Sequence, residues 1–410
     1  MRIALILETF PSLSETFILN QITGILDLGH EVKIYSKMHS HQQKIHPDVK
    51  KYDLSKNTHY FPEIPRNKIL RVLKAILLIS KNFYKNPLLI LNSINLFKYG
   101  KNALSLRNLY YVIPFLKENF DIIHCHFGPI GIIGAYLKGV GVPGIYITSF
   151  HGYDVNSYPR LMGKGVYNDL FVQGDLFTVN TNFTKQQVLK LGCDKRKIAV
   201  LPVGLNIDKF EFSQRLVQPG KPVKILTVGR LVEKKGYEYA LKAIAKLVAD
   251  QKNIIYFIAG DGPFKKKLDY LVSKLRIKNY VKFFGAVEQE EVLDLYQQAH
   301  IFLLPSVTAK NGDREGQALV LQEAQAVGLP VISTIHNGIP EGVLDGKSGF
   351  LVPERDVDAL ADRLIYLIEH QELWLSMGWL GRKFVESHFN IKKLNKELIQ
   401  IYEELLSKTF

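Results

Sequence analysis

Short apolar runs alternate with helix-length segments twice along this chain of 410 residues. The alternation predicts βαβ units and parallel sheets. A stretch that is rich in Pro and Gly and weak in periodicity, residues 202–222, separates the two series. The sequence therefore predicts an α/β protein with two doubly wound, Rossmann-like domains facing each other across a cleft, and ligands beyond the carboxyl ends of the strands. The expected strands are residues 3–7, 31–36, 121–124, 144–149, 176–180 and 198–201, then 225–228, 254–259, 281–284, 301–304 and 331–333.

Cysteine content and hydropathy narrow the class of protein. Only two cysteines occur, Cys125 and Cys193, which excludes a disulfide scaffold and suits a reducing compartment. The opening apolar run is too short for a signal peptide. The sequence has no run of 18 or more apolar residues, so we expect no transmembrane helix. These features favour a cytoplasmic location.

Positive charge is concentrated in the first half of the chain. Up to Leu205 there are 25 Lys and Arg against 13 Asp and Glu, whereas the remainder has 28 against 26. Residues 66–101 contain eight basic residues and no acidic one. Four of them share one face of a predicted helix, and the other face is apolar. Such a basic amphipathic helix favours contact with an anionic membrane surface; the alternative is a core helix with a solvated basic face. Those four are Arg71, Lys74, Lys81 and Lys85.

The segment 315–328, EGQALVLQEAQAVG, follows a predicted strand and a polar loop. With a helix expected over 317–327, the amides at its start would lack partners within the helix and would bind a diphosphate. Glu315 and Glu323 are eight residues apart, about 12 Å if the span is helical. One carboxylate would then face a sugar and the other a ribose; the alternative is an acidic helix terminus with a solvated glutamate. The expected amides are those of Gly316, Gln317, Ala318 and Leu319.

This segment resembles the E-x7-E region of the retaining GT4 glycosyltransferases, which have the GT-B fold. The resemblance extends through GLPVIST and HNGIPEGVLDGKSGFLVPERDVDALA and covers essentially the whole chain. It implies that Glu323 contacts the donor ribose and that Glu315 lies close to the transferred sugar. It also implies a crossing C-terminal helix. We expect an acceptor-binding domain at 1–205, a nucleotide-sugar-binding domain at 206–385 and the crossing helix at 386–410.

Further matches add candidate residues. VGRLVEKKG resembles the family segment whose Arg and Lys reach the donor diphosphate, which implies Arg230 and Lys235. Two cations there stabilise a leaving diphosphate without a metal, so no cofactor or metal is expected. SFHGYDV implies that His151 lies close to the anomeric centre. The opening FPSLSETFILNQI resembles colanic-acid and amylovoran enzymes, and Ser14 and Glu15, where the family has a Gly-Gly turn, are expected on the acceptor side with His126.

Two patterns suggest metal binding. We expect His124 and His126 to point to opposite faces of a strand and no third ligand to join them, so a metal pair is not expected. Asp356 and Asp358 resemble a DxD motif, but they precede an apolar helix, so a helix N-cap is the better interpretation.

These observations predict a retaining hexosyltransferase with a nucleoside-diphosphate sugar donor, UDP-sugar favoured over GDP-sugar. The expected acceptor is a polyprenyl-diphosphate-linked glycan in exopolysaccharide or cell-surface polysaccharide synthesis, met at the inner face of the cell membrane. A GT-B phosphorylase and a sugar-nucleotide epimerase are alternatives, as is an inactive partner subunit. A nucleic-acid partner is not expected, because 66–101 lacks interleaved aromatic stacking.

Overall fold

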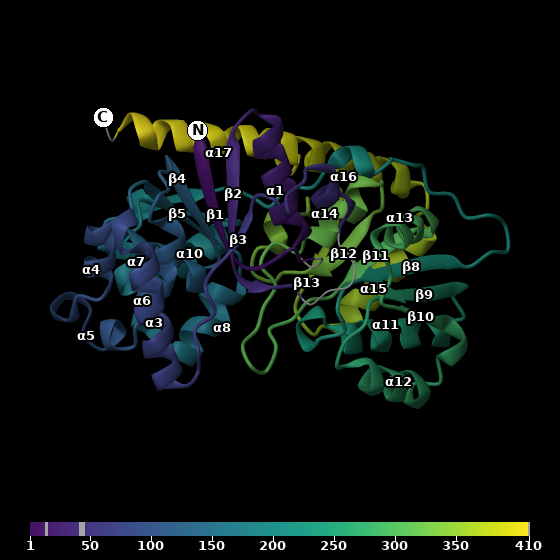
Figure 1. Ribbon diagram of the computed structural model, residues 1–410. Coiled ribbons are helices and arrows are strands. Elements are labelled where there is room, and N and C mark those ends of the chain that lie inside the picture. Colours follow the sequence, from purple (N-terminus) through teal and green to yellow (C-terminus); the bar gives the residue numbers. More distant parts are fainter. Residues whose placement is uncertain (13–14, 41–45, 409–410) are drawn as a thin grey trace. The chain divides into compact units, whose positions relative to one another are not determined.

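The computed structural model describes residues 1–12, 15–40 and 46–408, except for the side chains of residues 101 and 102 (Figure 1). The chain forms two compact units. The first comprises Met1–Val179, Lys185–Leu201 and Asn395–Phe410, and the second comprises Asn180–Thr184 and Pro202–Leu394. Each unit contains one sheet.

The first unit contains a seven-stranded parallel sheet in the order β3-β2-β1-β4-β5-β6-β7. Six of these strands were predicted from the sequence. The additional strand, β3, has the sequence THY and no fully buried residue, so no apolar run marks it, whereas the equally short edge strand β7 is apolar throughout. The strands are β1 (Arg2–Phe10), β2 (Glu31–His39), β3 (Thr58–Tyr60), β4 (Ile122–His126), β5 (Ile145–Phe150), β6 (Leu176–Val179) and β7 (Ile198–Val200).

Helices cover both faces of this sheet. Ala4 and Ile6 of β1 pack on one side, with Leu109, Ile130 and other apolar residues. Ile3, Leu5 and Leu7 pack on the other, with residues of α1 and α17. The helices after β1 are α1 (Thr16–Asp27), α2 (Pro47–Lys51), α3 (Lys68–Asn82), α4 (Pro87–Ser93), α5 (Leu96–Leu104), α6 (Arg107–Val112), α7 (Gly128–Val140), α8 (Tyr153–Met162), α9 (Asn168–Gln173) and α10 (Asn182–Lys190), with α17 (Ile391–Ser407) at the end of the chain.

The second unit has a six-stranded parallel sheet in the order β10-β9-β8-β11-β12-β13. Five strands were predicted and β13 was not. Its strands are β8 (Val223–Val228), β9 (Ile254–Ala259), β10 (Val281–Gly285), β11 (Ile301–Leu304), β12 (Val331–Thr334) and β13 (Gly349–Val352). Its helices are α11 (Tyr237–Ala249), α12 (Lys265–Lys274), α13 (Gln289–Gln298), α14 (Leu319–Ala326), α15 (Val357–Glu369) and α16 (Leu373–His388).

Both sheets have the strand order of a doubly wound fold, in which the direction of winding reverses beside the first strand. The reversal falls between β1 and β4 in the first unit and between β8 and β11 in the second. The predicted fold class, two Rossmann-like domains of the GT-B type, is confirmed. Among the described helices, none is both long and apolar enough to cross a membrane.

Candidate functional site

The reversal point of the second sheet brings the loops after β8 and β11 together. Gly236, just before α11, has φ +70°, and a Cβ there would lie 1.7 Å from the carbonyl oxygen of Pro305. Only glycine allows this approach, since an L side chain is strained at positive φ and has no space. The loop after β8 therefore packs closely on the loop that follows β11.

Lys235 and Glu315 form an ion pair at this junction. The Lys235 Nζ lies 2.9 Å from a Glu315 carboxylate oxygen, and the two side chains are 12% and 9% exposed. Lys234, which the sequence analysis did not single out, lies 3.5 Å from the other carboxylate oxygen and 3.3 Å from Asp313. Burial alone would raise the pKa of Glu315, but the two lysines outweigh it and lower the pKa to about 2. Glu315 is therefore ionised at neutral pH.

His336 fixes the backbone at Glu315. The Glu315 amide donates a hydrogen bond to His336 Nε2 (3.2 Å), and His336 Nδ1 lies 2.6 Å from a Glu354 carboxylate oxygen. Because Nε2 accepts, Nδ1 carries the proton and donates it to Glu354. Burial lowers the pKa of His336, which agrees with a neutral imidazole. Glu354 also accepts a hydrogen bond from the Thr308 amide (2.8 Å). Together, the hydrogen bonds of His336 and Glu354 hold both ends of the loop that follows β11.

The predicted helix start after Glu315 is wrong by two residues. α14 begins at Leu319, and its N-cap, Ala318, has φ 60°. The turn at 316–318 is therefore not helical, and the separation of about 12 Å expected for two glutamates on one helix does not apply. The Gln317 side chain bonds both backbone groups of Val203, at 2.7 and 2.8 Å.

The amides of this turn are available to a ligand. No described residue accepts a hydrogen bond from the amides of Gly316, Gln317, Ala318 or Leu319. They belong to a turn and to the first residue of a helix, where backbone donors and the helix dipole favour an anion. The predicted amides thus lie together, but a turn that contains the left-handed residue Ala318 brings them together, and not the predicted first turn of a helix.

Glu323 lies on α14 and contacts a neighbouring helix. The Tyr296 hydroxyl of α13 donates to one carboxylate oxygen at 2.9 Å. Burial raises the pKa of Glu323 above its ordinary value, and the Tyr296 hydrogen bond opposes that shift. One carboxylate oxygen is thus engaged, and no described residue donates a hydrogen bond to the other. Tyr296 was missed because no local pattern marks it.

Arg230 follows β8 and Gly229, whose φ is +150°. The Arg230 side chain is exposed and makes no ion pair with any described residue. The second unit therefore offers Arg230, the two lysines and the turn amides at the carboxyl end of its sheet. This set is chemically suited to a diphosphate.

Three histidines stack in the first unit. The rings of His124 and His126 lie 4.8 Å apart, and those of His126 and His151 lie 5.4 Å apart. The expectation that His124 and His126 face opposite ways is wrong, because residues i and i+2 of a strand share a face. His124 uses both ring nitrogens, toward Tyr402 and Ser149 at 2.6 Å each, which argues against metal ligation on a different ground.

Two groups hold His151, the residue that follows β5: the imidazole ring of His126 and the carboxylate of Asp154. His126 Nδ1 lies 3.2 Å from His151 Nε2, and the buried Asp154 carboxylate accepts from the His151 amide at 3.1 Å. Burial lowers the pKa of His151 to about 3, so the imidazole is neutral. His126 is fully buried, so it can position His151; its expected place on the acceptor side stays a prediction.

The two other acceptor-side candidates lie near the start of α1. Glu15 is its N-cap residue, and burial, with a contribution from Glu8, raises the pKa of Glu15 to about 7. Ser14 lies outside the described residues.

The possible DxD motif is a helix cap, as predicted. Asp356 accepts a hydrogen bond from the Ala359 amide (2.9 Å) at the start of α15, and Asp358 pairs with Lys246. In the described part of the chain, no group of three or more His, Cys, Asp or Glu side chains is arranged to hold a metal ion.

The basic segment forms the expected helix, α3, but the alternative of a core helix with a solvated basic face is wrong. Arg71 donates to the carbonyl oxygens of Pro65, Arg66 and Ser105, and Lys74 donates to that of Glu63. These cations face the protein, and apolar side chains of the opposite face are exposed. An amphipathic pattern alone does not say which face packs inward.

Two family models match consecutive parts of the chain. "Glycosyltransferase Family 4" matches residues 14–209, and "Glycosyl transferases group 1" matches residues 208–384. The protein is therefore a glycosyltransferase, and the chain belongs to the family that these two models describe.

Similar proteins and structures agree with that assignment. The chain is 36% identical to "Putative colanic acid biosynthesis glycosyltransferase WcaL" of Escherichia coli (strain K12), over 99% of this chain and all of that protein. It is 33% identical to "Amylovoran biosynthesis glycosyltransferase AmsK" of Erwinia amylovora, over the same shares. The fold matches that of Anabaena Alr3699/HepE in complex with UDP, with a TM-score of 0.72 and 15% identity over 98% of this chain and all of that one.

Proposed function

We propose that this glycosyltransferase moves a hexose, with retention of configuration, from a UDP-sugar to a polyprenyl-diphosphate-linked glycan during exopolysaccharide synthesis. The observation that carries the proposal is the cluster after β8 and β11, where Lys235, Glu315 and the turn amides meet. The names of the colanic-acid and amylovoran relatives support the pathway class. The UDP complex of Alr3699/HepE supports the base, although relatives at 26% identity are named as GDP-mannose-dependent.

The chemistry follows from charge. The bond between C1 and the β-phosphate oxygen breaks, and the diphosphate leaves with the electron pair. Arg230, Lys235 and the amides of the 316–319 turn stabilise the negative charge that develops on it. The acceptor oxygen forms its bond to C1 on the same face, which gives retention, and the hydroxyl proton leaves on a phosphate oxygen of the departing diphosphate.

Glu315 has a separate part in this scheme. Its carboxylate is ionised at neutral pH because two lysines hold its pKa at about 2. A fixed negative charge stabilises an oxocarbenium-like centre. The part of His151 at the anomeric centre stays a prediction from the resemblance; its low pKa makes it a neutral hydrogen-bonding group there.

Thermal denaturation with a panel of nucleotides and nucleotide sugars tests donor recognition. A ligand at 100 times its Kd stabilises the native state by about 2.7 kcal/mol, so UDP and one UDP-sugar should raise the Tm by several degrees. GDP-sugars should have a smaller effect. A larger response to GDP-sugars than to UDP-sugars would overturn the proposed base.

Turnover with a glycolipid extract then tests the reaction class. The proposal expects release of UDP together with incorporation of the sugar into the lipid fraction. Dependence on inorganic phosphate would instead identify a phosphorylase, and an epimerised free donor would identify an epimerase.

A further inference from the structure

Exposed large apolar side chains gather on α3, α4 and α5. Of the 26 exposed large apolar side chains among the described residues, thirteen lie between Ile69 and Leu104. Soluble proteins rarely leave such a patch open without a partner. Those on α3 and the turn after it form what we call the α3 apolar face: Ile69, Leu70, Val72, Leu73, Ile76, Leu77, Phe83 and Tyr84.

The helix is attached to the unit by its other side. Ala75 and Asn82 are buried, and Leu78 and Ile79 pack against the core of the unit. Arg71 and Lys74 bind backbone carbonyl oxygens on the flank of that contact. Rotating the helix to bury its apolar face would break these hydrogen bonds, so the apolar face is held toward solvent.

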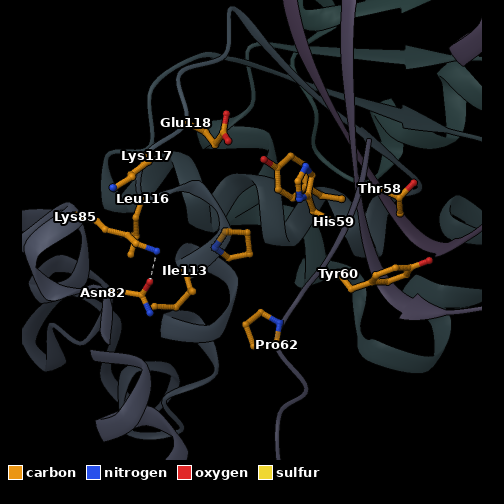
Figure 2. A pocket seen from close by; sticks show the side chains of 12 residues that line it. Thr58, His59, Tyr60, Pro62, Asn82, Lys85, Ile113, Leu116, Lys117 and Glu118 are labelled. Atoms are coloured by element: carbon orange, nitrogen blue, oxygen red, sulfur yellow. Dashed lines mark hydrogen bonds between the residues drawn. The ribbon is translucent and has the colours of Figure 1, made fainter. Parts of the chain in front are cut away.

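Charge at one end of the face identifies its occupant. A cavity of about 520 Å³ begins where the face ends, and Lys85 and Lys117 line it together with Glu118 (Figure 2). Glu118 is already paired with Lys33 (2.9 Å) and Arg2 (3.2 Å), so it leaves the charge of the two lysines uncompensated.

The apolar face and the cavity are continuous through Tyr84. Lys117 lies 5.3 Å from the ring centre of Tyr84, and Tyr84 precedes Lys85. An apolar surface bordered by cations, in a segment without acidic residues, complements the interface of an anionic bilayer. A second copy of the same face would bring like charges together.

We propose that the α3 apolar face inserts into the interface of an anionic membrane, with Lys85 and Lys117 contacting lipid phosphates at its edge. This inference rests on the proposed action on a lipid-linked acceptor. It assigns attachment to the apolar face with Lys85 and Lys117, and not to Arg71 and Lys74, which bind backbone carbonyl oxygens of the protein. The helix lies in the plane of the interface and does not span the bilayer.

Co-sedimentation with vesicles tests the insertion. The full chain is mixed with vesicles of phosphatidylcholine alone or with one quarter phosphatidylglycerol. The double variant Leu73→Gln with Leu77→Gln, residues 58% and 51% exposed, should bind the anionic vesicles at least about tenfold more weakly, or about 1.4 kcal/mol. The matched control, Leu375→Gln with Leu380→Gln in α16, residues 45% and 42% exposed, should bind as the parent does.

A second pair of variants tests the charged edge. Lys85→Gln with Lys117→Gln should reduce binding to the anionic vesicles severalfold and leave the weaker binding to neutral vesicles unchanged. Equal loss in both vesicle types would overturn the assignment of these lysines to lipid phosphates.

Three outcomes would overturn the insertion: no binding by the parent, equal binding by parent and Leu73/Leu77 variant, or a parent dimer that the variant abolishes. Circular dichroism and UDP binding of the variant show that it is folded. Because UDP is assigned to the second unit, loss of vesicle binding with UDP binding retained separates this inference from the proposed function.

Discussion

Glu315 is a buried carboxylate whose ionisation stabilises the folded chain. Its pKa is lowered from 4.5 to about 2, against the effect of burial, by Lys235 and Lys234. A carboxyl group with a lower pKa in the folded state contributes stability above pH 4.5, and that contribution is lost as the pH falls toward 2. Glu315→Gln keeps the shape and removes the charge, so it should be less stable than the parent at neutral pH.

The pH dependence is the measurement. The difference in the free energy of unfolding between parent and Glu315→Gln should shrink below pH 4.5, by up to about 1.4 kcal/mol per pH unit. Glu290→Gln, at an exposed position of α13, serves as control and should differ little from the parent at any pH. A difference for Glu315→Gln that does not change between pH 7 and pH 3 would contradict the ion pair.

Glu323 gives a prediction about donor affinity. Glu323→Ala removes the carboxylate that we propose as an acceptor for the ribose and takes the stronger of two acceptors from the Tyr296 hydroxyl, so UDP binding should weaken by about 1–3 kcal/mol. Tyr296→Phe keeps the carboxylate and loses the contacts of the Tyr296 hydroxyl with Glu323 (2.9 Å) and with the Val320 carbonyl oxygen (3.3 Å), so its effect should be smaller. Calorimetric titration with UDP measures both. Unchanged affinity in Glu323→Ala would remove Glu323 from the donor site.

Sequence reasoning at the residue scale found the charged pair but not its support. Glu315 and Lys235 stand in recognisable segments, whereas His336 and Glu354 become neighbours only because β12 and β13 pair side by side. The same limit applies to Tyr296, which reaches Glu323 from another helix. Partners that lie on separate elements leave no mark in local spacing.

At the scale of an element, the start of α14 depends on one left-handed residue. Ala318 has φ 60° and is buried. An alanine pays about 1–2 kcal/mol there, so Ala318→Gly should keep donor binding and stabilise the chain by up to about 1 kcal/mol. Ala318→Val should destabilise it. Ala324→Gly, inside the same helix, should cost about 1 kcal/mol or more. Denaturant unfolding compares the three, and a loss in Ala318→Gly would contradict the assigned turn.

Element boundaries and faces were the weaker part of the sequence reading. The helix after Glu315 was expected to begin at residue 317, because composition does not reveal a single residue with positive φ. The helix α3 was expected correctly, but its amphipathic pattern gave no information on which face the rest of the unit would contact. In this chain the contact is decided by backbone carbonyl oxygens that accept from Arg71 and Lys74.

At the scale of the whole molecule, the alternation of strands and helices was sufficient for the fold. Buried parallel strands are apolar on both faces, so runs such as 254–259 are visible without any structure. The two strands that were missed have a weaker signal: β3 contains no apolar run, and β13 begins with a glycine and has two partly exposed residues. The strand order then places the site, because the reversal beside β8 fixes which loops meet.

The charge assembled by the second unit leads to a last prediction, that transfer needs no divalent cation. Arg230, Lys234 and Lys235 outnumber Asp313 and Glu315, and the turn amides add further donors, so a leaving diphosphate meets net positive charge from the protein itself. Sugar transfer and UDP binding should therefore persist in EDTA at the rate seen with magnesium. Asp356→Asn, at the α15 cap, is the control: it should cost at most about 1 kcal/mol of stability and leave the response to metal unchanged. The opposite result would be a loss of activity in EDTA, its recovery with manganese or magnesium, and a loss of activity in Asp356→Asn. That result would assign Asp356 to a metal site and show that the cations after β8 do not stabilise the leaving diphosphate by themselves.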